Sequence, residues 1–256
     1  MENLKLALVQ ADLIWENVDA NRRQFQQRIS EIDRDIDLIV LPEMFSSGFT
    51  MHPERVYETM EGPTLEWMKD LSKQHGAAIC GSLVIREGEV FRNRFLFVHP
   101  EGKVDYYDKR HSFTYAGEDK KYKRGDTRKL ILYKGWKIFP QVCYDLRFPV
   151  FSRNDMEYDL LIYVANWPEI RIDAWDTLLK ARAIENMAYS VGVNRIGKDG
   201  NDYAYPGHSG AYDELGKTLV HTSGEEVVYV SLNRSQMLKT RAKLRFLEDR
   251  DLFNLK

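Results

Sequence analysis

Short apolar runs that end on a polar residue constrain this chain more than any other feature of its sequence. The runs are residues 36–41, 77–84, 136–142, 159–165 and 190–194. Runs of this length, bounded by turn signals, are typical of strands that are buried on both faces of a sheet. Between them lie stretches with apolar residues at helical spacing, at residues 16–35, 63–75 and 173–189. The alternation of the two patterns predicts an α/β protein with a largely buried sheet.

The middle and the end of the chain add the signals of antiparallel hairpins. Turn sequences at residues 86–89 and 100–103 each lead from one apolar stretch into another. The further strands are expected at residues 4–9, 90–98, 104–107, 207–212 and 227–232. The sheet is therefore mixed, and we expect it to be doubled into a sandwich.

Length and composition narrow the class of protein. The chain has 256 residues and no Gly-, Ser- or Pro-rich linker, which predicts a single domain over residues 1–256. A net charge of -2 gives no overall attraction to nucleic acid or acidic lipid. No apolar run is long enough to span a bilayer, and the first residues lack the apolar core of a signal peptide. Two cysteines make no disulfide framework, so we expect a reducing, cytoplasmic setting without nucleic-acid or membrane partners.

The last stretch, residues 234–256, combines many charges with apolar side chains. The apolar residues are Met237, Leu238, Leu244, Phe246, Leu247 and Phe253. Such a stretch is too apolar for a free tail, so we predict that it packs on a second copy of the chain.

Cys143 stands at the point where the run of residues 136–142 changes character. Tyr144, Asp145 and Arg147 follow it, and Pro149 suits the first turn of a helix. A cysteine at such a strand-to-helix turn can present its thiol to a substrate beside free backbone N–H groups. The alternative is a buried cysteine that acts as a small hydrophobe. We assign that structural role to Cys80, whose neighbours are apolar.

Three buried runs end in chemically useful side chains, namely Glu43, Cys143 and Asn166. Ligands of α/β sheets bind at the carboxyl ends of strands, so these residues are predicted to share a pocket. Glu43 can take the thiol proton as general base and return it to a leaving group. A cation such as Lys109 and the N–H of Tyr144 can stabilise the oxyanion of an attacked carbonyl. The chemistry predicted is acyl transfer through a thioester.

The chain resembles the nitrilase (carbon–nitrogen hydrolase) superfamily, and the resemblance extends over almost its whole length. The matching segments are Val9-Gln10, Leu41-Pro42-Glu43, Asp108-Lys109-Arg110-His111, Val142 to Pro149, Ala165-Asn166-Trp167-Pro168, Arg182 to Asn186 and Val193 to Gly197. Within that superfamily the sequence is most similar to the omega-amidase branch. The resemblance implies a four-layer α-β-β-α sandwich that forms a homodimer through helices beside the active site.

The resemblance also implies roles for individual residues. It carries a Glu-Lys-Cys triad onto Glu43, Lys109 and Cys143, and it makes Glu118 a second catalytic carboxylate that positions the lysine. It makes Arg147 the anchor for a substrate carboxylate, a role that suits a bidentate guanidinium. The other residues expected to bind substrate are Phe113, Tyr115, Asn166 and Trp167. The implied substrates are omega-amides of small dicarboxylic acids, such as alpha-ketoglutaramate and alpha-ketosuccinamate.

Neither a cofactor nor a metal is expected for this reaction. The histidines, including His111 and His208, show no close pairing in sequence, although distant ligands can converge in a fold. Three alternatives stay open at this point. They are another amidase, carbamoylase or nitrilase with the same triad, a papain-like hydrolase that uses His111 or His208, and a non-catalytic binding module.

Overall fold

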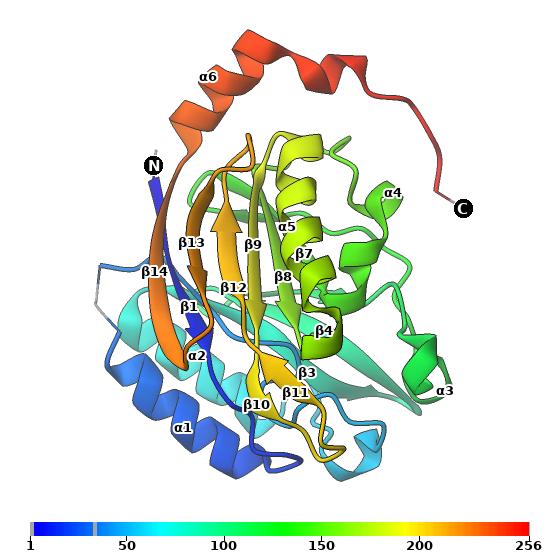
Figure 1. Ribbon diagram of the computed structural model, residues 1–256. Coiled ribbons are helices and arrows are strands. Elements are labelled where there is room, and N and C mark those ends of the chain that lie inside the picture. The colour runs from blue at the N-terminus through cyan, green and yellow to red at the C-terminus, as the bar shows by residue number, and fades with distance from the viewer. Residues whose placement is uncertain (1–2, 33–34, 256) are drawn as a thin grey trace.

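The computed structural model describes residues 3–32 and 35–255, and its strands form two six-stranded sheets (Figure 1). The first sheet contains, in spatial order, β14 (Glu226–Asn233), β1 (Asn3–Gln10), β2 (Leu38–Val40), β3 (Ala78–Glu87), β4 (Val90–Val98) and β5 (Val104–Asp108). The second contains β13 (Thr218–Thr222), β12 (Ser209–Tyr212), β9 (Tyr189–Asn194), β8 (Leu160–Ala165), β7 (Trp136–Val142) and β6 (Ile131–Tyr133). A small two-stranded sheet pairs β10 (Ile196–Lys198) with β11 (Ala204–Pro206).

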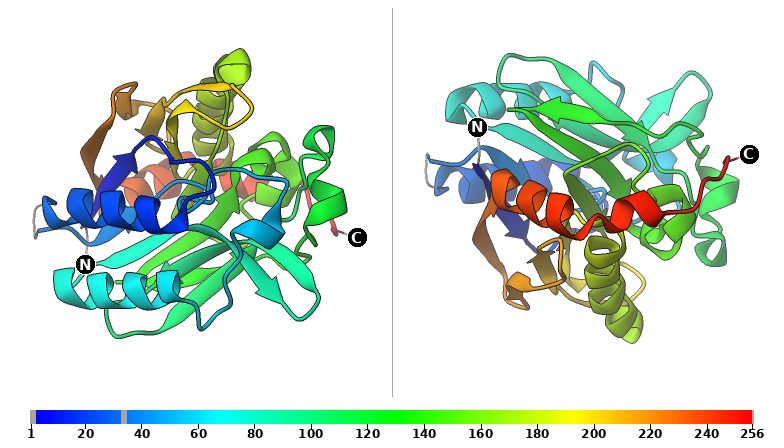
Figure 2. Two further views of the ribbon diagram at one scale, coloured as in Figure 1. Left: turned by 90° about the horizontal axis from the view of Figure 1, so that it is seen from below. Right: turned by 90° about the horizontal axis from the view of Figure 1, so that it is seen from above.

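Helices cover the outer faces of both large sheets. The α-helices are α1 (Val18–Ser30), α2 (Pro63–His75), α3 (Glu118–Lys121), α4 (Pro149–Ser152), α5 (Ile172–Asn186) and α6 (Arg234–Leu244). Short 3₁₀ helices are η1 (Pro53–Arg55), η2 (Thr114–Ala116), η3 (Cys143–Arg147), η4 (Glu169–Arg171) and η5 (Phe246–Asp249). Figure 2 shows α1 and α2 on one side of the molecule and α5 on the opposite side.

Alternation along β1 shows how the layers are built. Leu4, Leu6 and Leu8 belong to the core between the two sheets, whereas Ala7 and Val9 belong to the core beneath α1 and α2. Successive side chains of a strand point to opposite faces, so a strand in the middle of the stack must be apolar on both. The expected mixed sandwich, with four layers in the order α-β-β-α, is confirmed.

Gly192 on β9 lets α5 lie close to the second sheet. A Cβ atom at this position would lie 2.5 Å from Leu179 and 2.6 Å from Trp175, both on α5. Glycine is therefore required here by the close approach of a helix rather than by a turn. This contact fixes α5 against the sheet, and Trp175 in its first turn packs against Trp167, with 5.6 Å between the ring centroids.

Several predicted boundaries change by a few residues. The helix expected over residues 16–35 is α1, which ends at Ser30, and residues 33–34 lie outside the described residues. The helix expected over residues 173–189 is α5, which begins at Ile172 and ends at Asn186, and Asp173 is not its N-cap, since Arg171 occupies that position without a side-chain hydrogen bond. Asp173 instead lies in the first turn, where a negative charge suits the helix dipole. Arg182 and Glu185, three residues apart on α5, form an ion pair at 2.8 Å.

The C-terminal stretch first packs on its own chain. Met237 of α6 is buried, Arg234 binds Asp159 at 2.8 Å, and Arg241 donates a 2.6 Å hydrogen bond to the carbonyl of Tyr158. Beyond the helix, Phe246 and Leu252 are 55% and 93% exposed. This tail therefore leaves apolar side chains uncovered in the single chain.

Within residues 3–32 and 35–255, no helix has the length and apolar character needed to cross a bilayer.

Candidate active site

The ends of strands from both sheets meet at one place. Glu43 follows β2 of the first sheet, and Asn166 follows β8 of the second. The Asn166 backbone N–H donates a 2.8 Å hydrogen bond to Oε2 of Glu43, and its side-chain amide donates to the Glu43 carbonyl at 2.7 Å. Asn166 therefore holds the carboxylate in a fixed orientation between the sheets.

A buried ammonium lies between two buried carboxylates. Nζ of Lys109 is 3.1 Å from Oε1 of Glu43 and 3.0 Å from each carboxylate oxygen of Glu118. Glu43, Lys109 and Glu118 are 0%, 4% and 1% exposed. Charges in such a dry setting persist only when they are paired and hydrogen-bonded. The structure thus brings together three of the predicted residues that come from separate parts of the chain.

Asn93 on β4 completes this charged cluster, and the sequence analysis did not identify it. Its amide nitrogen lies 2.8 Å from Oε1 of Glu43 and 3.5 Å from Oε1 of Glu118, while its oxygen accepts from Ser82 at 2.8 Å. The backbone carbonyl of Asn93 also accepts from the Lys109 N–H at 3.0 Å. The only signal in the sequence for such a role is that Asn93 is an uncharged polar residue within the strand predicted at residues 90–98.

Glu118 is placed by a short turn. It is the first residue of α3, and Gly117 before it has a φ of 78°. Its Oε2 accepts from the Phe113 N–H at 2.6 Å, which orients the carboxylate toward Lys109. Glu118 accepts hydrogen bonds from the ammonium of Lys109 and none from the thiol of Cys143. This contact suits a residue that positions the lysine.

Cys143 lies on a strained turn at the end of β7. Its φ is 45°, in the left-handed region, and it begins η3. The buried carboxylate of Asp145 supports the turn by accepting from the Val142 N–H at 3.0 Å and from the Tyr107 hydroxyl at 2.9 Å. Tyr144 is in the first turn of η3, where N–H groups lack an acceptor within the helix. The turn therefore presents both a thiol and a free donor.

Neighbouring charges set the protonation of the thiol and the lysine. Burial raises the pKa of the Cys143 thiol well above its ordinary value, and the Glu43 carboxylate adds to the shift. Burial opposes the charged form of Lys109, but Glu118 and Glu43 outweigh it and raise the pKa of the ammonium. Burial also raises the pKa of Glu118, with Lys109 opposing. The site therefore holds a protonated thiol, a cationic lysine and an adjacent carboxylate.

Cys143 opens into a cavity of about 510 Å³, a size suited to a small organic substrate. Lys109, Tyr144 and Asn166 contribute to its lining. The aromatic residues expected at the pocket also line it: Phe113, Tyr115 and Trp167. Tyr115 is 83% exposed, which places it at the rim. Glu43 and Glu118 lie behind this surface, within hydrogen-bonding distance of Lys109.

Three arginines line the same cavity; Arg55 is paired with Glu16 at 3.1 Å, and the other two are Arg147 and Arg171. The guanidinium of Arg147 lies 4.9 Å from the centre of the Trp167 ring, and that of Arg171 lies 5.2 Å from the centre of the Phe113 ring. Over residues 3–32 and 35–255, neither Arg147 nor Arg171 has an acidic partner within 4.0 Å. Arg147 was predicted as a substrate anchor, whereas Arg171 was not identified. Arginines stacked on aromatic rings without a carboxylate are available to bind an anion.

The two histidines considered as catalytic bases are engaged elsewhere. Nδ1 of His111 lies 2.7 Å from Asp145, and its ring stacks on Phe148 with 3.9 Å between centroids. His208 is paired with Asp176 at 2.8 Å. Neither histidine lines the cavity that contains Cys143. The geometry therefore favours Glu43 over a histidine as the proton acceptor for the thiol.

Comparisons with known proteins agree with this geometry. A family model described as carbon–nitrogen hydrolase matches residues 5–242. The omega-amidase YafV of Yersinia enterocolitica is 47% identical to this chain, over 85% of this chain and 84% of its own length. The omega-amidase YafV of Escherichia coli K12 is 41% identical over the full length of both chains. A 2-oxoglutaramate amidase of Bacillus subtilis is 27% identical over 97% of this chain and 98% of its own. The solved structure of the CN-hydrolase superfamily protein XC1258 from Xanthomonas campestris has a TM-score of 0.97, with 41% identity and complete coverage of both chains.

The charge of Glu43 is predicted to hold the Cys143 thiol in its protonated form. Glu43→Gln removes that charge while Lys109 remains, so the pKa of Cys143 should fall and more thiolate should be present at a given pH. Thiolate absorbance in the ultraviolet, followed against pH, measures this. Subtracting the Cys143→Ala signal removes the contribution of Cys80, and exposed Glu61→Gln is the control. A midpoint in Glu43→Gln equal to or above that of the parent would contradict the electrostatic account.

Proposed function

The chain belongs to the carbon–nitrogen hydrolase family and is an amide-hydrolysing enzyme, and we propose that it is an omega-amidase acting through a thioester on Cys143. The observation that carries the proposal is the buried contact of Lys109 with Glu43 and Glu118 behind the thiol. This arrangement supplies a base, an oxyanion donor and a nucleophile in one cavity. The reaction requires no group beyond these side chains and water.

Acylation begins when Sγ of Cys143 attacks the carbon of the substrate's terminal amide. The thiol proton passes to the carboxylate of Glu43 as the C–S bond forms. The carbonyl oxygen becomes an oxyanion, which the ammonium of Lys109 and the N–H of Tyr144 stabilise. Glu43 then gives its proton to the amide nitrogen, the C–N bond breaks, and ammonia leaves. Because the thiol starts protonated, this step depends on a base that can accept its proton.

Deacylation uses the same groups in reverse. Water attacks the thioester carbon while Glu43 takes one of its protons, and Lys109 again stabilises the oxyanion. The C–S bond then breaks, and the sulfur recovers a proton from Glu43. Glu118 keeps Lys109 charged and in place throughout, since it contacts the ammonium with both carboxylate oxygens. The products are a dicarboxylic acid and ammonia.

The polar groups of the cavity favour a substrate with an amide at one end and a carboxylate at the other. Arg147 supplies a guanidinium for the carboxylate. The side-chain amide nitrogen of Asn166 donates a hydrogen bond to the Glu43 carbonyl. The side-chain oxygen of Asn166 is buried and has no hydrogen-bond partner among the described residues. It can accept a hydrogen bond from a substrate N–H. Alpha-ketoglutaramate and alpha-ketosuccinamate carry these groups, and the relatives named omega-amidase and 2-oxoglutaramate amidase support this class.

A covalent adduct on Cys143 is the direct test of this function. Acid quenching during turnover of alpha-ketoglutaramate should give a protein whose mass includes the acyl group, located at Cys143 by peptide mapping. Glu43→Gln should lower ammonia release by about 10²- to 10⁴-fold, the range typical of a general base, whereas exposed Glu61→Gln should not. Turnover at the parent rate in Cys143→Ala would overturn the mechanism. A panel of carbamoyl amino acids and nitriles separates the omega-amidase from other members of the family.

Arg147 is predicted to bind the substrate carboxylate. Arg147→Gln should raise KM for alpha-ketoglutaramate about ten- to hundred-fold, since a hydrogen-bonded charged partner is lost, with a smaller change in kcat. A neutral aliphatic amide of similar length is the matched control, and its KM should stay within about two-fold. An equal rise in KM for both substrates would contradict this prediction and would assign Arg147 a structural role in packing against Trp167.

We also propose that the enzyme is a cytoplasmic homodimer whose C-terminal tail, residues 234–256, packs on the partner. The exposed apolar side chains of the tail support this proposal. A Phe246→Asp/Leu252→Asp variant should sediment as a monomer, or dissociate at higher concentration than the parent, in analytical ultracentrifugation. Leu215→Asp, at an exposed turn residue outside the tail, should sediment like the parent. An unchanged dimer in the tail variant would exclude the tail from the interface.

A further inference from the structure

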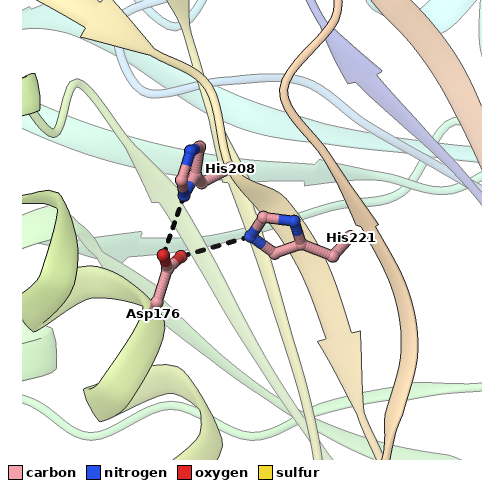
Figure 3. Close-up of side chains that lie close together, drawn as sticks. All are labelled: Asp176, His208 and His221. Atoms are coloured by element: carbon pink, nitrogen blue, oxygen red, sulfur yellow. Dashed lines mark hydrogen bonds and ion pairs between the residues drawn. The ribbon is translucent and has the colours of Figure 1, made fainter.

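A second group of chemically useful side chains lies outside the catalytic cavity. Asp176 is in the first turns of α5, His208 precedes β12, and His221 lies on β13. Figure 3 shows the Asp176 carboxylate between the two imidazole rings, with one nitrogen of each ring directed toward it. None of the three residues lines the cavity that contains Cys143. The group therefore has no part in the proposed amide hydrolysis.

The distances within this group are close to those of a metal site. Oδ2 of Asp176 lies 2.8 Å from Nδ1 of His208, and Oδ1 lies 3.4 Å from Nε2 of His221. All three donor atoms lie within 4.8 Å of one another. Bonds of about 2.0–2.1 Å to a tetrahedral ion place neighbouring donor atoms roughly 3.3 Å apart. Small side-chain rotations are enough to reach that geometry.

We propose that Asp176, His208 and His221 form a binding site for one divalent transition-metal ion of the Zn²⁺ class. Two imidazoles and one carboxylate are donors that Zn²⁺ and Ni²⁺ accept, whereas Mg²⁺ and Ca²⁺ prefer an all-oxygen shell. The side chains of Asp176, His208 and His221 are 32%, 25% and 35% exposed. An ion can therefore reach them from solvent, and water can complete its coordination.

The backbone around the ligands is held in place before any ion binds. The indole N–H of Trp175 donates a 2.8 Å hydrogen bond to the carbonyl of His208. His221 is paired with Gly210 in the ladder between β12 and β13. The preceding Gly207 has a φ of 80°, and its carbonyl accepts from Asn194 at 2.7 Å. Such preorganisation lowers the cost of bringing ligands from three segments to one ion.

An ion at this site would join the helical layer to the edge of the second sheet. β13 is the edge strand of that sheet, and Asp176 belongs to the helix that covers it. The ring of Trp175 also lies 5.6 Å from that of Trp167, a wall of the catalytic cavity. The bound ion therefore stabilises the edge hairpin and supports one wall of the pocket from outside. Its role is structural, since no donor atom faces the thiol.

Calorimetric titration with Zn²⁺ tests the site. Because a free thiol also binds Zn²⁺, the titration uses the Cys143→Ala protein as parent. We expect about one ion per chain with a micromolar or lower Kd, and no saturable binding of Mg²⁺. Asp176→Asn and His221→Gln should each weaken binding by at least about ten-fold. His221→Gln is preferred to a change at His208, whose left-handed φ of 63° makes folding sensitive to substitution.

Thermal unfolding gives a readout that is independent of catalysis. Saturating Zn²⁺ should raise the melting temperature of the parent by about 5 °C and leave that of His221→Gln unchanged. His75→Gln, which changes a histidine on α2, is the matched control and should behave like the parent. The proposal is overturned if the parent binds no Zn²⁺ saturably, or if His221→Gln binds and melts as the parent does. Neither result depends on whether the enzyme is an omega-amidase.

Discussion

The contact of one buried ammonium with two buried carboxylates is the constraint on which the rest of the structure depends. Moving each ion out of water costs several kcal/mol, and removing one member of such a group typically costs about 3–5 kcal/mol. The charges of Glu43, Lys109 and Glu118 are therefore kept only because Asn93 and Asn166 satisfy their remaining hydrogen bonds. These partners come from both sheets, so the cluster also fixes how the sheets meet at their carboxyl ends.

A further buried carboxylate, that of Asp145, explains the local strain at Cys143. A left-handed φ at a non-glycine residue costs about 1–3 kcal/mol and persists only where neighbours enforce it. Here Asp145 enforces it by binding the backbone N–H groups of Val142 and His111. His111, one of the two histidines considered for a papain-like mechanism, thus binds the carboxylate that supports the turn. The carboxylate that does influence the thiol is Glu43, held from the opposite sheet.

The sequence predicted the fold and the strand-end residues because both follow from local patterns. Buried runs that end on Glu43, Cys143 and Asn166 are visible without coordinates, and the carboxyl-end rule brings them together. Asn93 was missed because its role depends on the register of β4 against β3, which pairs it with Val84 and sets it across from Glu43. The group of Asp176, His208 and His221 was missed for a similar reason. Its members meet only through the packing of α5 on the sheet edge, and no spacing in the chain encodes that contact.

Charge balance inside the cavity connects the catalytic cluster to substrate choice. The carboxylates of Glu43 and Glu118 outnumber the single ammonium of Lys109, so this cluster gives the cavity no net positive charge to attract an anion. Of the three arginines in the cavity wall, Arg55 is paired with Glu16, whereas Arg147 and Arg171 have no acidic partner among the described residues. In the proposed function the carboxylate of the substrate supplies a partner for a guanidinium group, and a neutral amide does not. In the reaction that we propose, selectivity for an anionic amide comes from Arg147 and Arg171, and the ammonium of Lys109 stabilises the oxyanion that forms.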